Sequence, residues 1–201
     1  MSEEHEKNYL DNGEGFRSWF FTVDHKRIGV MYLWAIGVFF IIAAIASFLL
    51  RAEHLTPGQT IVSADTYNVL FTLHGSMMVF LFIVPGVAAS FGNFLIPLMI
   101  GAKDVIFPKL NLYSFWLYLA GALIFMIALA APADTGWTFY TPYSIETGAN
   151  VILITFGIFV LGFSSILTGI NFIVTMHKLR APGMTWDRLP LFCWAAYATS
   201  L

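Results

Sequence analysis

Charge is what this sequence lacks most. Only 11% of its 201 residues are Asp, Glu, Lys or Arg, whereas 58% are hydrophobic. A soluble domain carries roughly 25% charged residues and cannot solvate so apolar a surface, so the composition indicates an integral membrane protein. The net charge of −2 provides no excess of cations to neutralise phosphates, which argues against a nucleic acid partner.

Cysteine and a signal peptide are also missing. A single cysteine, Cys193, excludes an internal disulfide framework, and its apolar neighbours predict an inert core thiol. The acidic segment Met1–Glu14 has neither the basic region nor the adjacent apolar run of a cleavable signal peptide. Membrane targeting is therefore expected to depend on the first membrane helix.

Long apolar stretches are what the sequence has instead. Four reach the roughly 20 residues that a bilayer-spanning helix needs, which predicts an all-α transmembrane helix bundle. They are expected at about Ile28–Leu50, Tyr67–Ile100, Leu112–Ala131 and Ala149–Met176. The second is longer than one crossing requires, so we expect it to tilt, to kink near Pro85, or to end in a surface turn around Pro97.

The two ends of the chain suggest its organisation. Residues 1–27 are expected to form an N-terminal segment and residues 28–201 one membrane domain. A fifth apolar run begins at Leu189 and reaches only Leu201, about 13 residues, which is too short to cross a bilayer. We therefore expect the N-terminal part of a larger membrane protein, or one half of a split one.

The distribution of cations predicts the orientation. All but one of the ten Lys and Arg residues fall on the N-terminal side of the first helix. They are Lys7, Arg17, Lys26, Arg27, Lys103, Lys109, Lys178, Arg180 and Arg188. Only Arg51 lies on the opposite side, so the positive-inside rule places the N-terminus in the cytoplasm and the loops 51–64 and 132–150 outside.

One histidine interrupts the second apolar stretch. His74 lies within Tyr67–Ile100, which contains no Asp, Glu, Lys or Arg. An intramembrane ionisable residue indicates a functional site, and a heme iron is the partner we expect. His74 follows Asp65 by nine residues, so it lies about 13 Å down its helix, in the outer half of the membrane. A hydrogen bond to a neighbouring helix is the alternative.

Arg51 closes the outer end of the first helix in the same leaflet. A buried guanidinium needs an acceptor, and the carbonyl or carboxylate groups of a heme have a suitable geometry. The alternative is an arginine that extends to the membrane surface.

A second polar group lies toward the N-terminal side. Asp104 is in the short turn Gly101–Pro108. The accompanying amides and hydroxyls are Asn93, Asn111, Tyr32, Ser164 and Ser165. A carboxylate that gathers protons, followed by groups that hold ordered water, is what a proton path through a membrane requires. The alternatives are a solvated loop acid and ordinary packing of small residues between helices.

Longer motifs carry a resemblance to a known family. The run Thr72–Phe80 resembles the helix-two heme signature of subunit I of the heme-copper cytochrome c oxidases. Further segments follow in that family's order: Asp24–Gly29, Phe91–Asp104, Phe107–Asn111, Thr135–Thr138, Ser164–Leu167 and Ile170–Phe172. The resemblance extends from about Phe16 to Leu201 and implies part of the family's twelve-helix fold.

The resemblance implies roles for particular residues. His74 would be one of two axial ligands of the low-spin heme a, and Arg51 would hydrogen-bond its formyl group. Asp104 would be the entrance of the D proton pathway, lined by the amides and hydroxyls named above. Trp137 would contact a propionate of the second, high-spin heme. Leu112 stands where some relatives have a second asparagine, a departure in the lining of the pathway.

A metal site outside the membrane is implied as well. Glu53 and Gly58 fall where many relatives bind calcium or sodium, although this loop differs from theirs in length.

The implied activity belongs to a whole complex. Electrons from cytochrome c would pass through a copper centre on subunit II and heme A to a heme-copper site that reduces dioxygen to water and pumps protons. Subunits II and III and membrane lipid are the expected partners, in an energy-coupling membrane, here a bacterial inner membrane. The other heme and copper ligands would lie beyond Leu201, so the segment alone would be inactive. A quinol oxidase and a non-catalytic, truncated or split scaffold module are the alternatives.

Overall fold

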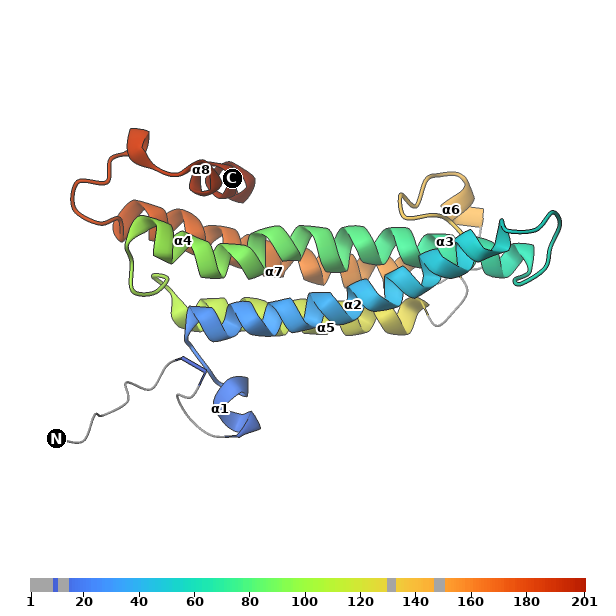
Figure 1. The fold of residues 1–201 in the computed structure, drawn as a ribbon, viewed down its shortest axis with the longest axis horizontal. Coiled ribbons are helices and arrows are strands. Elements are labelled where there is room, and N and C mark those ends of the chain that lie inside the picture. The colour runs from blue at the N-terminus through green and yellow to red at the C-terminus, as the bar shows by residue number, and fades with distance from the viewer. Residues whose placement is uncertain (1–8, 11–14, 130–132, 147–150) are drawn as a thin grey trace.

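The chain forms one bundle of long helices. The computed structural model describes residues 9–10, 15–129, 133–146 and 151–201, and all regular structure within these ranges is helical. Four helices are long and apolar enough to cross a membrane, and they lie side by side (Figure 1). The predicted all-α bundle with four crossings is confirmed.

The four crossings begin and end close to the predicted residues. In chain order they are α2 (His25–Glu53), the continuous run Ala64–Ile100, α5 (Pro108–Leu129) and α7 (Val151–Lys178). The expected limits Ala131 and Ala149 lie outside the described residues, as do Lys7 and the rest of 1–8 and 11–14 in the N-terminal segment. Two helices start earlier than their apolar stretches because polar residues cap them. Asp24 accepts from the backbone N–H groups of Lys26 and Arg27, and Ser63 accepts from that of Thr66.

The second crossing changes its helical geometry near Pro85. It consists of α3 (Ala64–Ser76), the π-helical segments η1 (Met77–Ile83) and η2 (Gly86–Phe91), and α4 (Gly92–Ile100). Proline has no N–H to donate and clashes with the preceding turn, and the two wider segments flank Pro85. The helix continues through Pro97 and ends where Gly101 adopts a φ of 73°. The expected surface turn around Pro97 is therefore wrong, because the left-handed conformation falls at the glycine.

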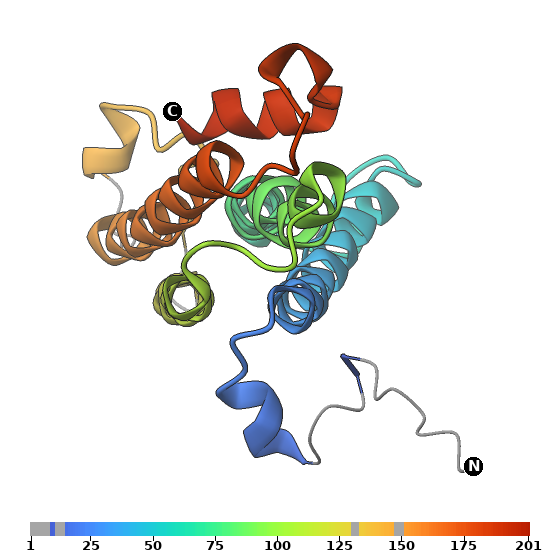
Figure 2. The same ribbon diagram turned by 90° about the vertical axis from the view of Figure 1, so that its left-hand side faces the viewer.

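Short elements lie beside the bundle near its two ends. They are α1 (Phe16–Phe20), α6 (Tyr143–Glu146), η3 (Trp186–Arg188) and α8 (Leu191–Ser200). Viewed end-on, α8 lies to one side of the long helices, next to α7 and α4, and α1 lies beside the start of α2 (Figure 2). Cys193 on α8 is fully buried against α4, with its sulfur 3.9 Å from that of Met99, as expected for a core thiol. The described cations other than Arg51 belong to elements at the end of the bundle that carries α1 and α8 (Figure 1).

Two glycines bring α5 and α7 into backbone contact. A Cβ atom added to Gly121 would lie 2.9 Å from the backbone N of Leu161, and one added to Gly157 would lie 2.9 Å from the backbone N of Phe125. Small residues at such positions allow helices to approach closely in a membrane. This contact holds Ser114 on α5 within hydrogen-bonding distance of Ser164 on α7.

We expect Gly157→Ala to destabilise the bundle, because the new methyl group meets backbone that cannot move without separating α5 from α7. Overpacking of this kind costs about 1–3 kcal/mol. Gly162→Ala on the same helix is the matched control, since no atom lies within 4 Å of the added Cβ. Thermal unfolding of the chain in detergent, followed by circular dichroism, should show a lower midpoint for Gly157→Ala only. Equal midpoints for the two variants would contradict the contact.

Candidate functional site

A chain of buried polar side chains runs through the middle of the bundle. Asn111 on α5 donates from Nδ2 to Oδ1 of Asn93 on α4 at 2.6 Å. Ser114, one turn further along α5, donates to the carbonyl of Asn111 at 2.7 Å. The hydroxyl of Tyr32 on α2 lies 3.3 Å from Oγ of Ser114 and 3.4 Å from Oγ of Ser164 on α7. Four crossings therefore contribute to one connected set of hydrogen-bonding groups.

Asn111 leaves one acceptor of this chain open. Its Oδ1 atom is buried and has no hydrogen-bond partner among the described residues. Buried polar atoms are nearly always paired with protein or with ordered water, so this oxygen marks a place where a water molecule would be stabilised.

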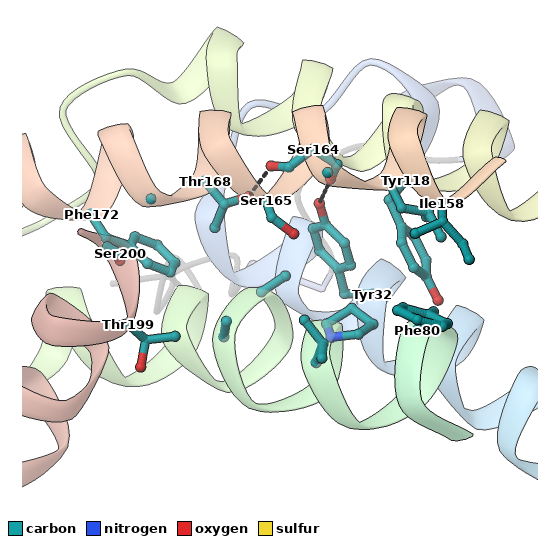
Figure 3. Close-up of a pocket in the computed structure, with 17 residues that line it drawn as sticks. Tyr32, Phe80, Tyr118, Ile158, Ser164, Ser165, Thr168, Phe172, Thr199 and Ser200 are labelled. Carbon is teal, nitrogen blue, oxygen red and sulfur yellow. Dashed lines mark hydrogen bonds between the residues drawn. The ribbon is translucent and has the colours of Figure 1, made fainter. Parts of the chain in front are cut away.

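The chain leads into a cavity of about 380 Å³ between α2, α7, α8 and the second crossing. Figure 3 shows the hydroxyl groups of Tyr32, Ser164, Ser165 and Thr168 beside it, with Phe80 among its apolar walls. Ser164 donates to the carbonyl of Ser114 at 2.7 Å, which ties the cavity to the polar chain. Ser165 lines the cavity, but no hydrogen bond joins it to that chain within the described residues. The space has enough polar groups on its wall to hold water.

Asp104 lies at the end of the polar chain nearest α1 and α8. It occupies the loop between α4 and α5 and is half-buried, with Oδ1 accepting from the N–H of Val105 at 2.7 Å. Burial raises the pKa of the Asp104 carboxyl above its usual range, and the charge of Asp24 acts in the same direction, whereas that hydrogen bond and His25 oppose the shift. Asp104 thus differs from a fully solvated loop acid.

The loop that carries Asp104 is fastened to α7. The N–H of Phe107 donates to Oδ1 of Asn171 at 3.0 Å, and the N–H of Ile106 donates to Oγ1 of Thr175 at 3.0 Å. Asn171 also donates from Nδ2 to the carbonyl of Phe107 at 3.3 Å. Our sequence reasoning did not assign these two residues, although their spacing of four places them on one face of a helix.

His25 and Ser114 were also missed. His25 is buried at the start of α2, where Nδ1 lies 2.6 Å from the carbonyl oxygen of Asn93. It thus connects the surroundings of Asp104 to the buried amides. The available signal was an ionisable residue directly after the helix-capping Asp24. Ser114 is a hydroxyl within an apolar helix, three residues after Asn111, a spacing that puts both on one face.

His74 lies on α3, in the half of the bundle away from Asp104. Its Nδ1 atom is 2.9 Å from the carbonyl oxygen of Ala43 on α2, which accepts a hydrogen bond and therefore fixes Nδ1 as the protonated nitrogen. Nε2 keeps its lone pair and has no hydrogen-bond partner among the described residues. An imidazole oriented in this way, through a backbone carbonyl, fits the ligand of a heme iron.

Trp137 lies beside the heme-ligand candidate. The N–H of Gly136 donates to Oγ1 of Thr72 at 2.9 Å, which fixes the loop to α3 two residues before His74. A Cβ atom on Gly75 would lie 3.0 Å from Cδ1 of the Trp137 ring, so the ring packs directly on the helix. The structure thus brings Trp137 next to the residue that follows His74.

Arg51 is not brought into direct contact with His74. Its side chain is exposed in the last turn of α2, eight residues beyond Ala43, which corresponds to about 12 Å along the helix. A bound group that contacted both residues would have to span that distance.

Glu53 is engaged with its own loop. Its carboxylate accepts from the N–H groups of Thr60, Ile61 and Val62 at 2.8, 2.7 and 2.9 Å. Gly58 lies in the same loop, with a φ of 89° that favours glycine. No cluster of three or more His, Cys, Asp or Glu suited to a metal occurs in the part of the chain that the structure describes. The calcium or sodium site stays a prediction.

Sequence comparisons match this chain to known proteins. The family model for cytochrome c and quinol oxidase polypeptide I matches residues 27–201. Cytochrome c oxidase subunit 1 of Thermostichus vulcanus is 44% identical over 183 residues, which cover 90% of this chain and 33% of the relative. The probable subunit 1-alpha of Streptomyces avermitilis is 41% identical over 189 residues, covering 91% of this chain and 32% of the relative. The chain thus spans about a third of the length of these curated relatives.

Proposed function

Because this chain belongs to the cytochrome c and quinol oxidase polypeptide I family, we propose that it forms the first helices of the catalytic subunit of a terminal respiratory oxidase. The observation that carries the proposal is one bundle that contains both a heme-ligand candidate and a buried polar chain. His74, whose Nδ1 atom hydrogen-bonds the carbonyl of Ala43, lies at one depth of the bundle. The hydrogen-bonded side chains that run from Asn93 to Ser164 lie at another. The family is expected to use heme and copper, and the activity requires the rest of the complex.

His74 would hold the iron of a low-spin heme A through Nε2. Arg51 would donate to the formyl group of this heme, and Trp137 to a propionate of the high-spin heme. A heme with two imidazole ligands accepts and passes on single electrons and has no open position for oxygen. The task of this chain is therefore to bind and orient the heme. Dioxygen would be reduced at a heme-copper site whose copper and remaining ligands lie in other helices.

Asp104 would admit protons. Its raised pKa keeps the carboxyl protonated to a higher pH than that of a solvated aspartate, and the polar chain offers hydrogen-bonding groups from Asn93 to Ser164. A buried site that gains an electron favours gaining a proton, because uncompensated charge is costly where the dielectric constant is low. This coupling would supply protons both to the reaction and to the pump.

The surroundings of the complex follow from the same proposal. Subunits II and III would complete it, with cytochrome c as the electron donor. The cations gathered at the α1 end of the bundle favour an orientation with that end in the cytoplasm of a bacterial inner membrane.

A quinol oxidase is the second candidate, since the matching family description names both donors. The residues named here would serve either enzyme. The sequence of the partner subunit distinguishes them, because a cytochrome c oxidase needs copper-binding cysteines and histidine there.

A reduced-minus-oxidised optical spectrum of the complex purified through this chain tests the proposal. We expect the band of a low-spin heme A, together with oxygen consumption driven by reduced cytochrome c. Oxygen consumption with quinol alone would favour the second candidate. A preparation that contains the remaining helices but no heme would contradict both.

We expect Asn171→Leu to slow proton uptake although Asp104 is intact. The substitution removes both hydrogen bonds to Phe107, so of the three bonds described above the loop that carries Asp104 keeps only that from Ile106 to Thr175 on α7. The N–H of Phe107 then loses its acceptor, which costs up to about 1–3 kcal/mol, whereas the carbonyl of Phe107 still accepts from the N–H of Asn111. Asn68→Leu, the same substitution at an exposed position on α3 away from this loop, is the control. Proton uptake by the purified complex, measured with a pH-sensitive dye, should fall in Asn171→Leu only, and an unchanged rate there would contradict this role of the loop.

A further inference from the structure

An apolar hollow lies beside α1, at the end of the bundle that carries most of the cations. Its volume is about 470 Å³, and six of the nine side chains that line it are aromatic. They are Phe16, Trp19 and Phe20 of α1, Val30, Met31 and Trp34 of α2, and Phe115, Trp116 and Leu119 of α5. We call this hollow the aromatic cradle.

The aromatic cradle is built by the packing of α1 against the start of the bundle. The ring centroids of Phe20 and Trp116 are 4.0 Å apart, and those of Phe16 and Phe20 are 5.9 Å apart. Two of the rings remain open to the surroundings, with 82% of Phe16 and 75% of Trp34 exposed. Aromatic rings at the level where a transmembrane helix starts are typical of the membrane interface.

Two arginines lie near the α1 side of the aromatic cradle. Arg27 is buried and donates from Nη2 to the carbonyl of Leu10 at 3.1 Å, and its guanidinium lies 4.8 Å from the centre of the Trp19 ring. Arg17 follows Phe16 on α1 and is exposed. Within residues 15–27, Asp24 is the one acid beside Arg17, Lys26 and Arg27, and its carboxylate accepts from the backbone at the start of α2. This part of the rim therefore carries a net positive charge, which favours an anion.

We propose that the aromatic cradle binds an acyl chain of an anionic phospholipid, whose phosphate is held at the rim by Arg17. The lipid belongs to the leaflet on the N-terminal side of α2. The two halves of the site match the two halves of such a molecule: an apolar hollow open to the membrane, and cations at the level of the headgroups. The proposal needs only the membrane bundle and does not depend on the oxidase activity.

The dimensions favour a lipid over a helix of another subunit. The cradle spans residues 30–34 of α2 and 115–119 of α5, about one turn or 6 Å of each helix. A helix with its side chains is about 10–12 Å across and packs along several turns, so it would find little contact here. The volume lies within the roughly 300–1,000 Å³ of small-molecule sites.

Native mass spectrometry of the intact complex, reconstituted in phosphatidylcholine nanodiscs with a minor fraction of phosphatidylglycerol, tests the proposal. We expect wild type to retain phosphatidylglycerol preferentially. Arg17→Gln should lower its occupancy about fivefold, the effect of one basic residue near a charged membrane surface. Trp34→Ala should lower it as well, because the wall of the hollow is removed. Arg188→Gln and Phe48→Ala are matched controls that remove a similar charge and a similarly exposed ring elsewhere. Equal retention by all five proteins would overturn the proposal.

A photoreactive phenylalanine analogue at position 16 identifies the occupant directly. The expected product after illumination is an adduct of this chain with phosphatidylglycerol. An adduct with another subunit would mean that a protein occupies the cradle and would overturn the lipid assignment. Both measurements are made on complexes with wild-type optical spectra, so loss of the fold does not imitate loss of the lipid.

Discussion

Replacing His74 with alanine is expected to abolish binding of the low-spin heme and to leave the helix bundle in place. The imidazole is the one group on α3 that combines a fixed Nδ1–H, bound to the carbonyl of Ala43 at 2.9 Å, with a free Nε2 lone pair. Without it the iron has no ligand on this face. The bundle loses one hydrogen bond, worth about 1 kcal/mol, which four packed helices tolerate. The optical spectrum of the purified complex should lack the low-spin band, and electron transfer to oxygen should cease.

His177→Ala is the matched control for this prediction. His177 is exposed near the end of α7, with its Nε2 atom 3.0 Å from the hydroxyl of Tyr197, and the heme spectrum should not depend on it. Adding free imidazole to the His74→Ala complex should restore part of the low-spin band, because the missing side chain leaves room for it. A wild-type band in His74→Ala without imidazole would remove the ligand assignment.

Replacing Asp104 with asparagine should slow proton uptake and turnover by at least about tenfold while both hemes remain bound, since a positioned proton-transferring side chain typically contributes a factor of 10² or more. Asparagine has the same shape and can still accept from the N–H of Val105, so the loop should keep its place. What is lost is the exchangeable proton. Stopped-flow uptake of protons and steady-state oxygen consumption measure the effect. Turnover equal to that of wild type would exclude Asp104 as the entrance.

The pH dependence should change together with the rate. Because burial raises the pKa of Asp104, its carboxyl holds a proton further up the pH scale, and uptake through it should fall as the pH rises through that pKa. In the Asp104→Asn variant, proton uptake should not show this decline with rising pH. The same shift means that ionised Asp104 disfavours the folded state, so stability should decline as the pH rises from the usual carboxyl range through the raised pKa.

Asp187→Asn is the control for the general effect of removing one negative charge from this end of the bundle. Asp187 lies on η3 at the same end of the bundle, but there the side chain of Thr185 hydrogen-bonds the carboxylate and lowers its pKa. The pKa values of these two acids, which lie at the same end of the bundle, are thus shifted in opposite directions. A loss of proton uptake in Asp187→Asn as large as that in Asp104→Asn would indicate a general effect of surface charge.

The four crossings were predictable because the bilayer sets one requirement, a stretch of apolar residues long enough to span it. The predicted limits differ from the structure where local chemistry intervenes. Helix α2 starts at His25 because the Asp24 carboxylate caps it, and the second crossing starts at Ala64 because the Ser63 hydroxyl caps it. Hydropathy registers neither effect.

The candidate site was predictable in part of its membership but not in its connections. Sequence motifs identified His74, Asp104 and the two asparagines, since polar groups stand out in an apolar helix. They did not reveal that Asn111 bonds to Asn93, or that Asn171 fastens the loop of Asp104. Such pairs join residues far apart in the chain, and the rotation of each helix decides which of them meet.

The sequence by itself determined the class of the protein, its number of crossings and the chemical types at its sites, because these depend on composition and local order. Only the tertiary structure decided that His74 faces Ala43, that Trp137 packs on Gly75, and that Tyr32 lies between Ser114 and Ser164. The physical reason is packing. The glycine contact between α5 and α7 and the wider turns around Pro85 set the spacing and rotation of the helices, and these set which polar groups lie within reach of one another.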